Sequence, residues 1–199
     1  NPVALLQEAA SHRTAAALVT LFTLHNRKAP HHGTCLVLTA NGQMEHHLPD
    51  GHLQNAITAD AHTALQTQTS FTKTYLTTGN DYTALITYLP PAPQLLIAGA
   101  GNDVIPLVKM AALMGWQAIV VDGRRGYATT ARFPEASQVL VSKSAQVLSL
   151  VHTDAHTAVI LMTHNYNYDL ELLAQLLPLP LPYIGVLGPA KNLQPILDE

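Results

Sequence analysis

The sequence predicts an α/β protein in which a small α+β unit with a mostly antiparallel sheet precedes a unit with a parallel sheet. Three observations carry this prediction: strands and helices alternate in the second half, a strand runs into a glycine turn and a helix over residues 95–107, and three prolines occupy residues 90–93. Such alternation is typical of a parallel sheet covered by helices, and prolines favour an extended connector. We therefore expect an α+β domain over residues 1–89, a linker over 90–93 and a Rossmann-like domain over 94–199.

Composition narrows the classes of function. The chain has 199 residues, of which 48% are hydrophobic and 12% are charged, and its formal net charge is −3. A nucleic-acid surface needs clustered Lys and Arg, whereas the ten basic residues here are scattered. The apolar stretch at residues 15–24 is too short to span a membrane, and no secretory signal is evident. We expect a cytoplasmic protein that binds neither nucleic acid nor membrane.

The amino-terminal unit begins with a helix and continues with strands. Residues 3–10 place apolar side chains at helical spacing, and residues 15–24 are rich in strand formers. A second strand is expected over residues 34–39. The pair Asn41-Gly42 then predicts a two-residue hairpin turn leading into residues 43–48.

A helix and two further strands complete this unit. The helix is expected over residues 52–65, and one of its faces carries four apolar side chains, those of Leu53, Ile57, Ala61 and Leu65. Strands are expected over residues 71–76 and 82–89.

The carboxy-terminal unit alternates between the two kinds of element. We expect strands over 94–98, 117–121, 138–141, 157–162 and 182–187, and helices over 103–114, 144–151, 167–177 and from about 190. The first of these helices should bury one apolar stripe, formed by Val104, Leu107, Val108, Ala111 and Met114. This order predicts a doubly wound sheet with helices on both faces.

The glycine turn predicts where a ligand binds. Gly99 permits a tight turn and Gly101 lets a phosphate approach the backbone, while the N–H groups of the following helix face the anion. Asn102 and Asp103 belong to the same turn and are candidate contacts. The dinucleotide fingerprint has a third glycine where Val104 stands, so a turn that binds nothing is the alternative.

Polar side chains follow two other strands of the same sheet. Asp122 ends the second strand, where an acidic residue can bind a ribose hydroxyl, whereas Arg124 beside it would suit a phosphate. A carboxylate that only caps a turn is equally consistent with the sequence.

Thr163, His164 and Asn165 come directly after a buried strand, and the carboxyl ends of parallel strands face the ligand crevice. His164 could transfer a proton near neutral pH, and Thr163 and Asn165 could hold a polar ligand. Asn165 or Asn167 also fits as the N-cap of the next helix.

Six segments together resemble the XdhC/CoxI family, whose members are also called xanthine dehydrogenase accessory factors. The segments occur in family order and cover essentially all of residues 90–189; they are residues 90–101, 111–116, 120–122, 132–134, 162–166 and 179–189. The joint occurrence is specific, although each segment alone is a weak signal.

The resemblance implies an accessory protein rather than an enzyme. Members are thought to bind molybdenum cofactor (molybdopterin), to aid its sulfuration and its insertion into molybdenum hydroxylases of the xanthine dehydrogenase type, and often to form dimers. We accordingly expect a homodimer with such a hydroxylase as its partner. The expected cofactor contacts are Gly99, Gly101, Asn102, Asp103, Asp122, Arg124, Thr163, His164 and Asn165, with no catalytic residue and no metal ligand.

Two other functions stay open. One is a small NAD(P)-dependent oxidoreductase with Asp122 on the ribose and His164 as proton donor. The other is a degenerate interaction protein whose crevice is empty.

The sequence departs from the family in three places. Asn102 stands where the family commonly has His, and residues 49–52 (Pro-Asp-Gly-His) stand where a turn containing cysteine is expected. The chain also stops at Glu199 where members usually continue, which fits a fragment or a short form. Because a thiolate is the natural soft ligand for molybdenum, the loss of that cysteine bears on metal or sulfur handling.

The cysteine and the histidines of the chain give little indication of a metal site. The single cysteine, Cys35, excludes an internal disulfide and is expected to be buried and unreactive. Among the eleven histidines, only His52 near His46 or His47 forms a cluster worth testing.

Overall fold

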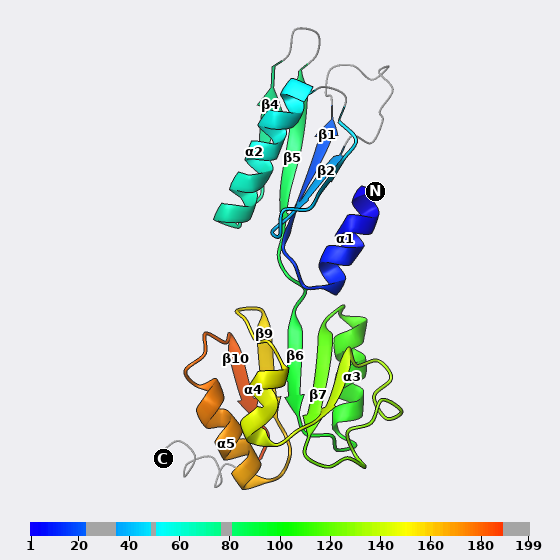
Figure 1. Ribbon diagram of the computed structural model, residues 1–199, viewed down its shortest axis with the longest axis vertical. Helices are drawn as coiled ribbons and strands as arrows, with labels where there is room; N and C mark the ends of the chain where they lie inside the picture. The colour runs from blue at the N-terminus through cyan, green and yellow to red at the C-terminus, as the bar shows by residue number, and fades with distance from the viewer. Residues whose placement is uncertain (23–34, 49–50, 77–80, 189–199) are drawn as a thin grey trace. The chain divides into compact units, whose positions relative to one another are not determined.

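The computed structural model describes residues 1–22, 35–48, 51–76 and 81–188. The chain divides into two compact units, Asn1–Pro91 and Ala92–Glu199 (Figure 1). In the described residues each unit contains a five-stranded sheet. The first sheet is antiparallel and the second is parallel, which confirms the predicted fold class. No helix among the described residues is long and apolar enough to cross a membrane.

The amino-terminal unit has two helices and five strands. In chain order they are α1 (Pro2–Ser11), β1 (Ala16–Phe22), β2 (Cys35–Thr39), β3 (Met44–His46), α2 (Gly51–Thr67), β4 (Phe71–Tyr75) and β5 (Tyr82–Leu89). The strand order is β3-β2-β1-β5-β4. Helix α1 begins as expected for its sequence, with the Asn1 side chain accepting a hydrogen bond from the N–H of Val3 and Pro2 in the first turn.

Helix α2 forms the core of this unit with one face of the sheet. Its buried residues lie at helical spacing, and they pack against alternate residues of the strands; the cluster includes Leu53, Ile57, Ala61, Ala64, Ala17, Val19, Leu36, Leu38, Ala84 and Ile86. Ala64, rather than the predicted Leu65, completes the fully buried face, and Leu65 is partly buried beside it.

The predicted hairpin forms, but with a longer turn. The N–H of Thr39 donates to the carbonyl of Gln43 at 2.9 Å, so three residues lie between these two hydrogen-bonded residues. Only Gly42 has a positive φ, +85°, and Asn41 does not. A two-residue turn of the Asn-Gly kind needs positive φ at both central residues, which explains the difference.

The carboxy-terminal unit follows the predicted alternation. Its elements are β6 (Gln94–Ala98), α3 (Val104–Leu113), β7 (Gln117–Asp122), β8 (Gln138–Val141), the 3₁₀ turn η1 (Ser144–Gln146), α4 (Val147–Leu150), β9 (Thr157–Leu161), α5 (Tyr166–Leu176) and β10 (Tyr183–Val186). All pairs are parallel, in the order β10-β9-β6-β7-β8. The helix predicted from about residue 190 lies outside the described residues.

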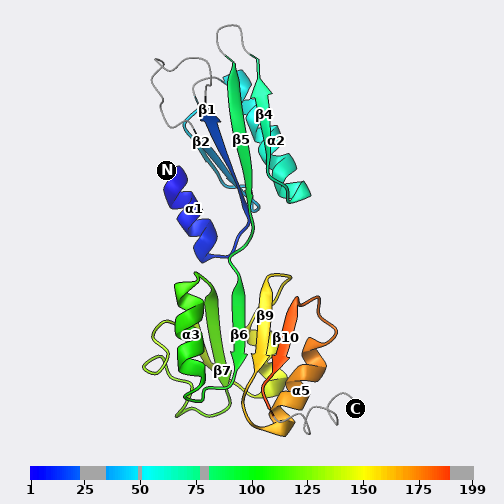
Figure 2. The ribbon, with the colours of Figure 1, turned by 180° about the vertical axis from the view of Figure 1, so that it is seen from behind.

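Helices cover both faces of this sheet, as the two opposite views show (Figures 1 and 2). Helix α3 packs with one set of strand residues, including Leu95, Ile97 and Val120. Helices α4 and α5 pack with the alternate set, including Leu96 and Val121. Because β6 lies at the centre and contacts both layers, all five of its residues are buried.

The prediction that Met114 belongs to the buried stripe of α3 is wrong. Val104, Val108 and Ala111 are buried, but Met114 is 61% exposed. The helix ends at Leu113, and Gly115, with φ +74°, turns the chain back toward β7. Met114 therefore lies beyond the last helical turn, outside the stripe that faces the sheet.

Candidate functional site

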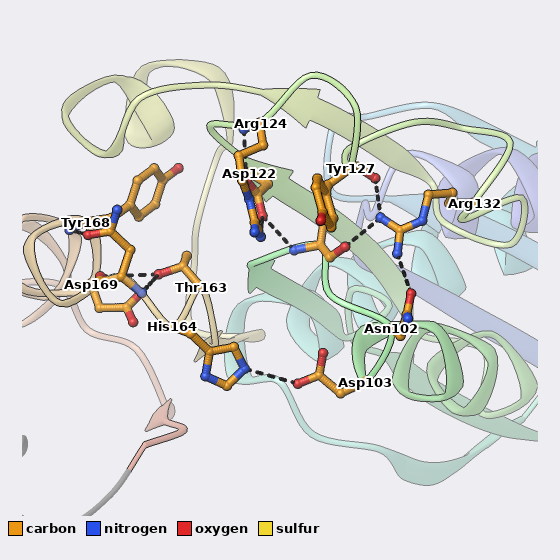
Figure 3. A network of polar contacts seen from close by, with 12 residues as sticks. Asn102, Asp103, Asp122, Arg124, Tyr127, Arg132, Thr163, His164, Tyr168 and Asp169 are labelled. Atoms are coloured by element: carbon orange, nitrogen blue, oxygen red, sulfur yellow. Dashed lines mark hydrogen bonds and ion pairs between the residues drawn. The ribbon is translucent and has the colours of Figure 1, made fainter.

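The strand order places a switch point between β6 and β9. From β6 the chain passes through α3 to β7 on one side, while β9 pairs with the other side of β6. In open α/β sheets, ligands bind outside the carboxyl ends of the strands at such a point. Two loops meet there, residues 99–103 after β6 and residues 162–165 after β9. Figure 3 shows Asn102 and Asp103 of the first loop and Thr163 and His164 of the second.

Gly99 has a structural reason to be glycine. Its φ is +127°, and a Cβ atom there would lie 2.5 Å from the carbonyl oxygen of Met162. The N–H of Gly99 donates to Val121 at 2.7 Å, and the N–H of Met162 donates to Ala98 at 2.7 Å. The turn therefore crosses directly over the end of β9, where only a residue without a side chain fits.

Residues 101–103 present their backbone at the start of α3. The N–H of Val104 donates to the carbonyl of Gly101 at 3.3 Å. Within the described chain, the N–H groups of Gly101, Asn102 and Asp103 donate no hydrogen bond. Orphan N–H groups at a helix start are suitable donors to an anion.

Asp122 ties the glycine turn to the end of β7. Its Oδ2 accepts from the N–H of Ala100 at 2.8 Å and from Nη2 of Arg124 at 2.7 Å. Its Oδ1 accepts from the backbone N–H and Nε of Arg124, at 2.8 and 2.9 Å. The residue is 3% exposed, so both carboxylate oxygens are used within the protein.

These contacts set the charge state of Asp122. Burial is the strongest single influence and raises the pKa of its carboxyl group. The hydrogen bonds and charge of Arg124, with the Ala100 N–H, together outweigh burial and hold the pKa below the ordinary value of 3.8. Asp122 is thus ionised, and its hydrogen bonds hold the turn in place. Its predicted contact with a ribose hydroxyl stays a prediction.

Arg132 holds the same turn from the other side. Its Nη1 donates to the carbonyl of Ala100 at 2.7 Å and to that of Tyr127 at 2.8 Å. Its Nη2 donates to Oδ1 of Asn102 at 2.8 Å. Asn102 therefore serves as an acceptor for this arginine.

Aromatic rings pack beside both arginines. The guanidinium carbon of Arg124 lies 4.2 Å from the centre of the Tyr127 ring. The guanidinium of Arg132 lies 5.2 Å from the same ring and 5.3 Å from that of Phe133. Because Phe133 is 1% exposed, it anchors the loop that presents Arg132.

The loop after β9 is organised by its own hydrogen bonds. The hydroxyl of Thr163 donates to Oδ1 of Asp169 at 2.6 Å and accepts from the N–H of Asn165 at 3.0 Å. The side chain of Asn165 accepts from the N–H of Tyr168 at 3.3 Å, which confirms Asn165 as the N-cap of α5. Burial raises the pKa of Asp169 more than the Thr163 hydrogen bonds lower it.

His164 has an unusual backbone conformation. Its φ is +58°, a left-handed value that L-residues other than Asn, Asp and His seldom adopt. Its Nε2 lies 3.5 Å from Oδ2 of Asp103, and the two side chains are 62% and 43% exposed. The pair spans the switch point and stays open to solvent.

Tyr168 forms the wall of the site on α5. Its hydroxyl donates to the carbonyl of Ser142 at 3.0 Å. Burial, followed by the negative charges of Asp122, Asp169 and Glu171, raises the pKa of its hydroxyl to about 12. The ring therefore stays neutral and fixed beside the carboxylates.

The structure gathers all nine predicted cofactor contacts at this edge of the parallel sheet. Their roles in binding remain predictions. Sequence patterns did not identify Tyr127, Arg132, Tyr168 and Asp169 as parts of the site. The signal that could have found Arg132 is the Arg-Phe-Pro segment, in which a basic residue precedes a core aromatic residue.

The described residues contain no group of three or more His, Cys, Asp or Glu side chains placed to hold a metal ion. The side chain of His52, on which the histidine cluster depended, lies outside the described residues. Cys35 is half-buried at the start of β2, in the other unit.

Comparison with known proteins identifies a family match in the carboxy-terminal unit. Residues 95–199 match the XdhC Rossmann domain. A relative from Bacillus subtilis (strain 168), named as a probable xanthine dehydrogenase subunit, is 36% identical over 110 residues, which are 55% of this chain and 33% of the relative. The alignment therefore spans about a third of that relative's length.

A solved structure supports the fold of the whole chain. It is named as a xanthine dehydrogenase from Bacillus halodurans, is 21% identical and superposes with a TM-score of 0.54, covering 100% of this chain and 85% of that one. At this identity the likeness shows the fold alone.

Proposed function

This chain belongs to the XdhC family, whose Rossmann domain it carries in residues 95–199, and we propose that it is an accessory protein that binds molybdenum cofactor. In this proposal it holds the cofactor for a molybdenum hydroxylase of the xanthine dehydrogenase type. The name of the Bacillus subtilis relative supports a partner of that class.

The observation that carries the proposal is the open backbone at the start of α3. Gly101, Asn102 and Asp103 present N–H groups without acceptors among the described residues. They lie at the switch point of a doubly wound sheet, where ligands bind in this class of fold. Such donors suit the phosphate group at the end of the pterin side chain.

The residues fit the organic part of the cofactor better than its metal. The described part of this unit offers backbone donors and arginines for an anion, while the only cysteine of the chain, Cys35, belongs to the amino-terminal unit. When bound, the cofactor supplies the molybdenum centre of the partner enzyme. This chain would hold it through the phosphate and the pterin and leave the metal free for transfer.

The test is retention of the isolated cofactor. Molybdopterin released from a purified molybdenum enzyme is mixed with the protein, and bound pterin and molybdenum are measured after gel filtration. NAD and NADP are titrated in parallel. We expect retention of the pterin, whereas NADP binding with a substrate-dependent absorbance change would replace the proposal with an oxidoreductase.

A substitution at the turn locates the ligand. In Gly101→Val, the new side chain meets Asp103 and blocks close approach to the backbone, so retention should be lost. Gly126→Val is the matched control, because nothing lies within 4 Å of a Cβ atom at Gly126. Equal retention by the two variants would place the cofactor elsewhere.

The occupied carboxylate of Asp122 weighs against the oxidoreductase. Binding of a ribose hydroxyl by Asp122 would require the loss of at least one of its hydrogen bonds to Ala100 or Arg124. If the folded wild-type protein bound neither NADP nor the pterin, the result would instead favour a degenerate interaction protein.

A further inference from the structure

The positive charge of Arg132 has no acidic partner among the described residues. Its three hydrogen bonds go to neutral oxygens, the carbonyls of Ala100 and Tyr127 and the side-chain amide of Asn102. An arginine in a protein is always protonated. The half-buried guanidinium is therefore a fixed cation that the surrounding chain does not neutralise.

The neighbouring arginines differ from Arg132 in this respect. Arg124 forms a two-pronged ion pair with Asp122, whose carboxylate neutralises it. Arg125 is exposed and follows Arg124 on the same loop. Of these three arginines, only Arg132 both lacks an acidic partner among the described residues and contacts the glycine turn directly.

The position of Arg132 is fixed before any ligand arrives. The Tyr127 and Phe133 rings lie within 5.3 Å of its guanidinium carbon, and buried Phe133 anchors the adjacent backbone. Three of its five N–H groups hold the loop and the turn together, which leaves two as donors. A preorganised cation loses little conformational entropy on binding.

We propose that Arg132 binds the phosphate group of the ligand and makes the site selective for phosphorylated ligands. The inference rests on the proposed function for the identity of that ligand, a pterin. The same chemistry would recognise a nucleotide, and the experiment separates the two sources.

The experiment compares each phosphorylated probe with its dephosphorylated form. One pair is the stable fluorescent pterin obtained by oxidation of molybdopterin, with its phosphate and after phosphatase treatment. The other pair is GMP and guanosine. Dissociation constants are measured for the wild type, Arg132→Gln and Arg125→Gln, the last being a matched control that removes one charge from the same loop.

We expect Arg132→Gln to weaken binding of the phosphorylated pterin about tenfold to a hundredfold, since a charge-assisted hydrogen bond is lost. Binding of the dephosphorylated pterin should stay unchanged, and Arg125→Gln should behave as the wild type. If Arg132 only held the turn in place, the substitution would weaken both forms of the probe equally. Circular dichroism and thermal unfolding establish that each variant is folded.

The outcomes separate this inference from the proposed function. Pterin phosphate bound equally by the wild type and Arg132→Gln overturns the inference and leaves the proposed function standing. Binding of GMP but not pterin, with dependence on Arg132, supports the inference and overturns the proposed function. Failure of the wild type to bind either phosphorylated probe overturns both.

Discussion

The imidazole Nε2 of His164 lies 3.5 Å from the carboxylate Oδ2 of Asp103. The two residues come from the loops after β9 and β6, so the contact spans the switch point of the parallel sheet (Figure 3). His164 reaches it with a φ of +58°. Strained backbone that persists at a ligand crevice is often part of a binding site.

The strain at His164 can be measured with two substitutions that both remove the imidazole. His164→Gly should be more stable than His164→Ala by about 1 kcal/mol, because glycine adopts the left-handed conformation without the steric cost borne by alanine. Urea unfolding gives the difference. At His152, which has no positive φ, glycine should be no more stable than alanine, and the same result at both positions would contradict strain at His164.

The two glycines of the turn should respond differently to alanine. At Gly99 the added Cβ would meet the backbone of Met162 at 2.5 Å and φ is +127°, so we expect Gly99→Ala to lower the free energy of unfolding by at least about 2 kcal/mol. At Gly101 the added Cβ meets only the side chain of Asp103, which can rotate, so the loss should stay below about 1 kcal/mol. Equal losses would show that the path of the turn over β9 is not fixed.

Much of this site could be predicted because its parts are local in sequence. One such pattern is a strand followed by Gly99 and a helix, and another is the Asn165 cap before an apolar helix. Each pattern extends over only a few consecutive residues. The ends of parallel strands then necessarily meet at one edge of the sheet.

The partners within the site could not be predicted in the same way. Ala100 forms hydrogen bonds with Asp122, 22 residues away, and with Arg132, 32 residues away. These contacts depend on the path of the loop between β7 and β8, which lacks any periodic pattern. Met114 was misplaced for a related reason, since helical periodicity does not show where a helix ends.

Asp122 should stabilise the fold in a pH-dependent way. Its folded pKa lies below the ordinary value of 3.8, so its contribution is present above that value and is lost as the pH falls through the folded pKa. Asp122→Asn should therefore lower the free energy of unfolding by about 2 kcal/mol near neutral pH. The gap to the wild type should narrow as the pH falls below 3.8.

Urea unfolding at a series of pH values tests this expectation. Glu135→Gln is the control, because it removes an exposed carboxylate from the same unit. A gap that stayed constant with pH would mean that the ionised carboxylate of Asp122 is not what holds the turn.

Tyr168 should act in the opposite pH range. Burial and the nearby carboxylates raise the pKa of its hydroxyl from 10.0 to about 12, so the unfolded chain ionises first and stability is lost as the pH rises between these values. Tyr168→Phe removes the hydrogen bond to Ser142 and should cost about 1 kcal/mol near neutral pH. Above the ordinary tyrosine pKa, however, the variant should lose stability less steeply than the wild type, because phenylalanine cannot ionise.

Tyrosinate absorbance and urea unfolding, measured together, test this expectation. Tyr183→Phe is the control for the loss of one hydroxyl, because the Tyr183 side chain is 57% exposed. Parallel stability curves for the wild type and Tyr168→Phe through the alkaline range would show that the ring is not held neutral beside Asp122 and Asp169.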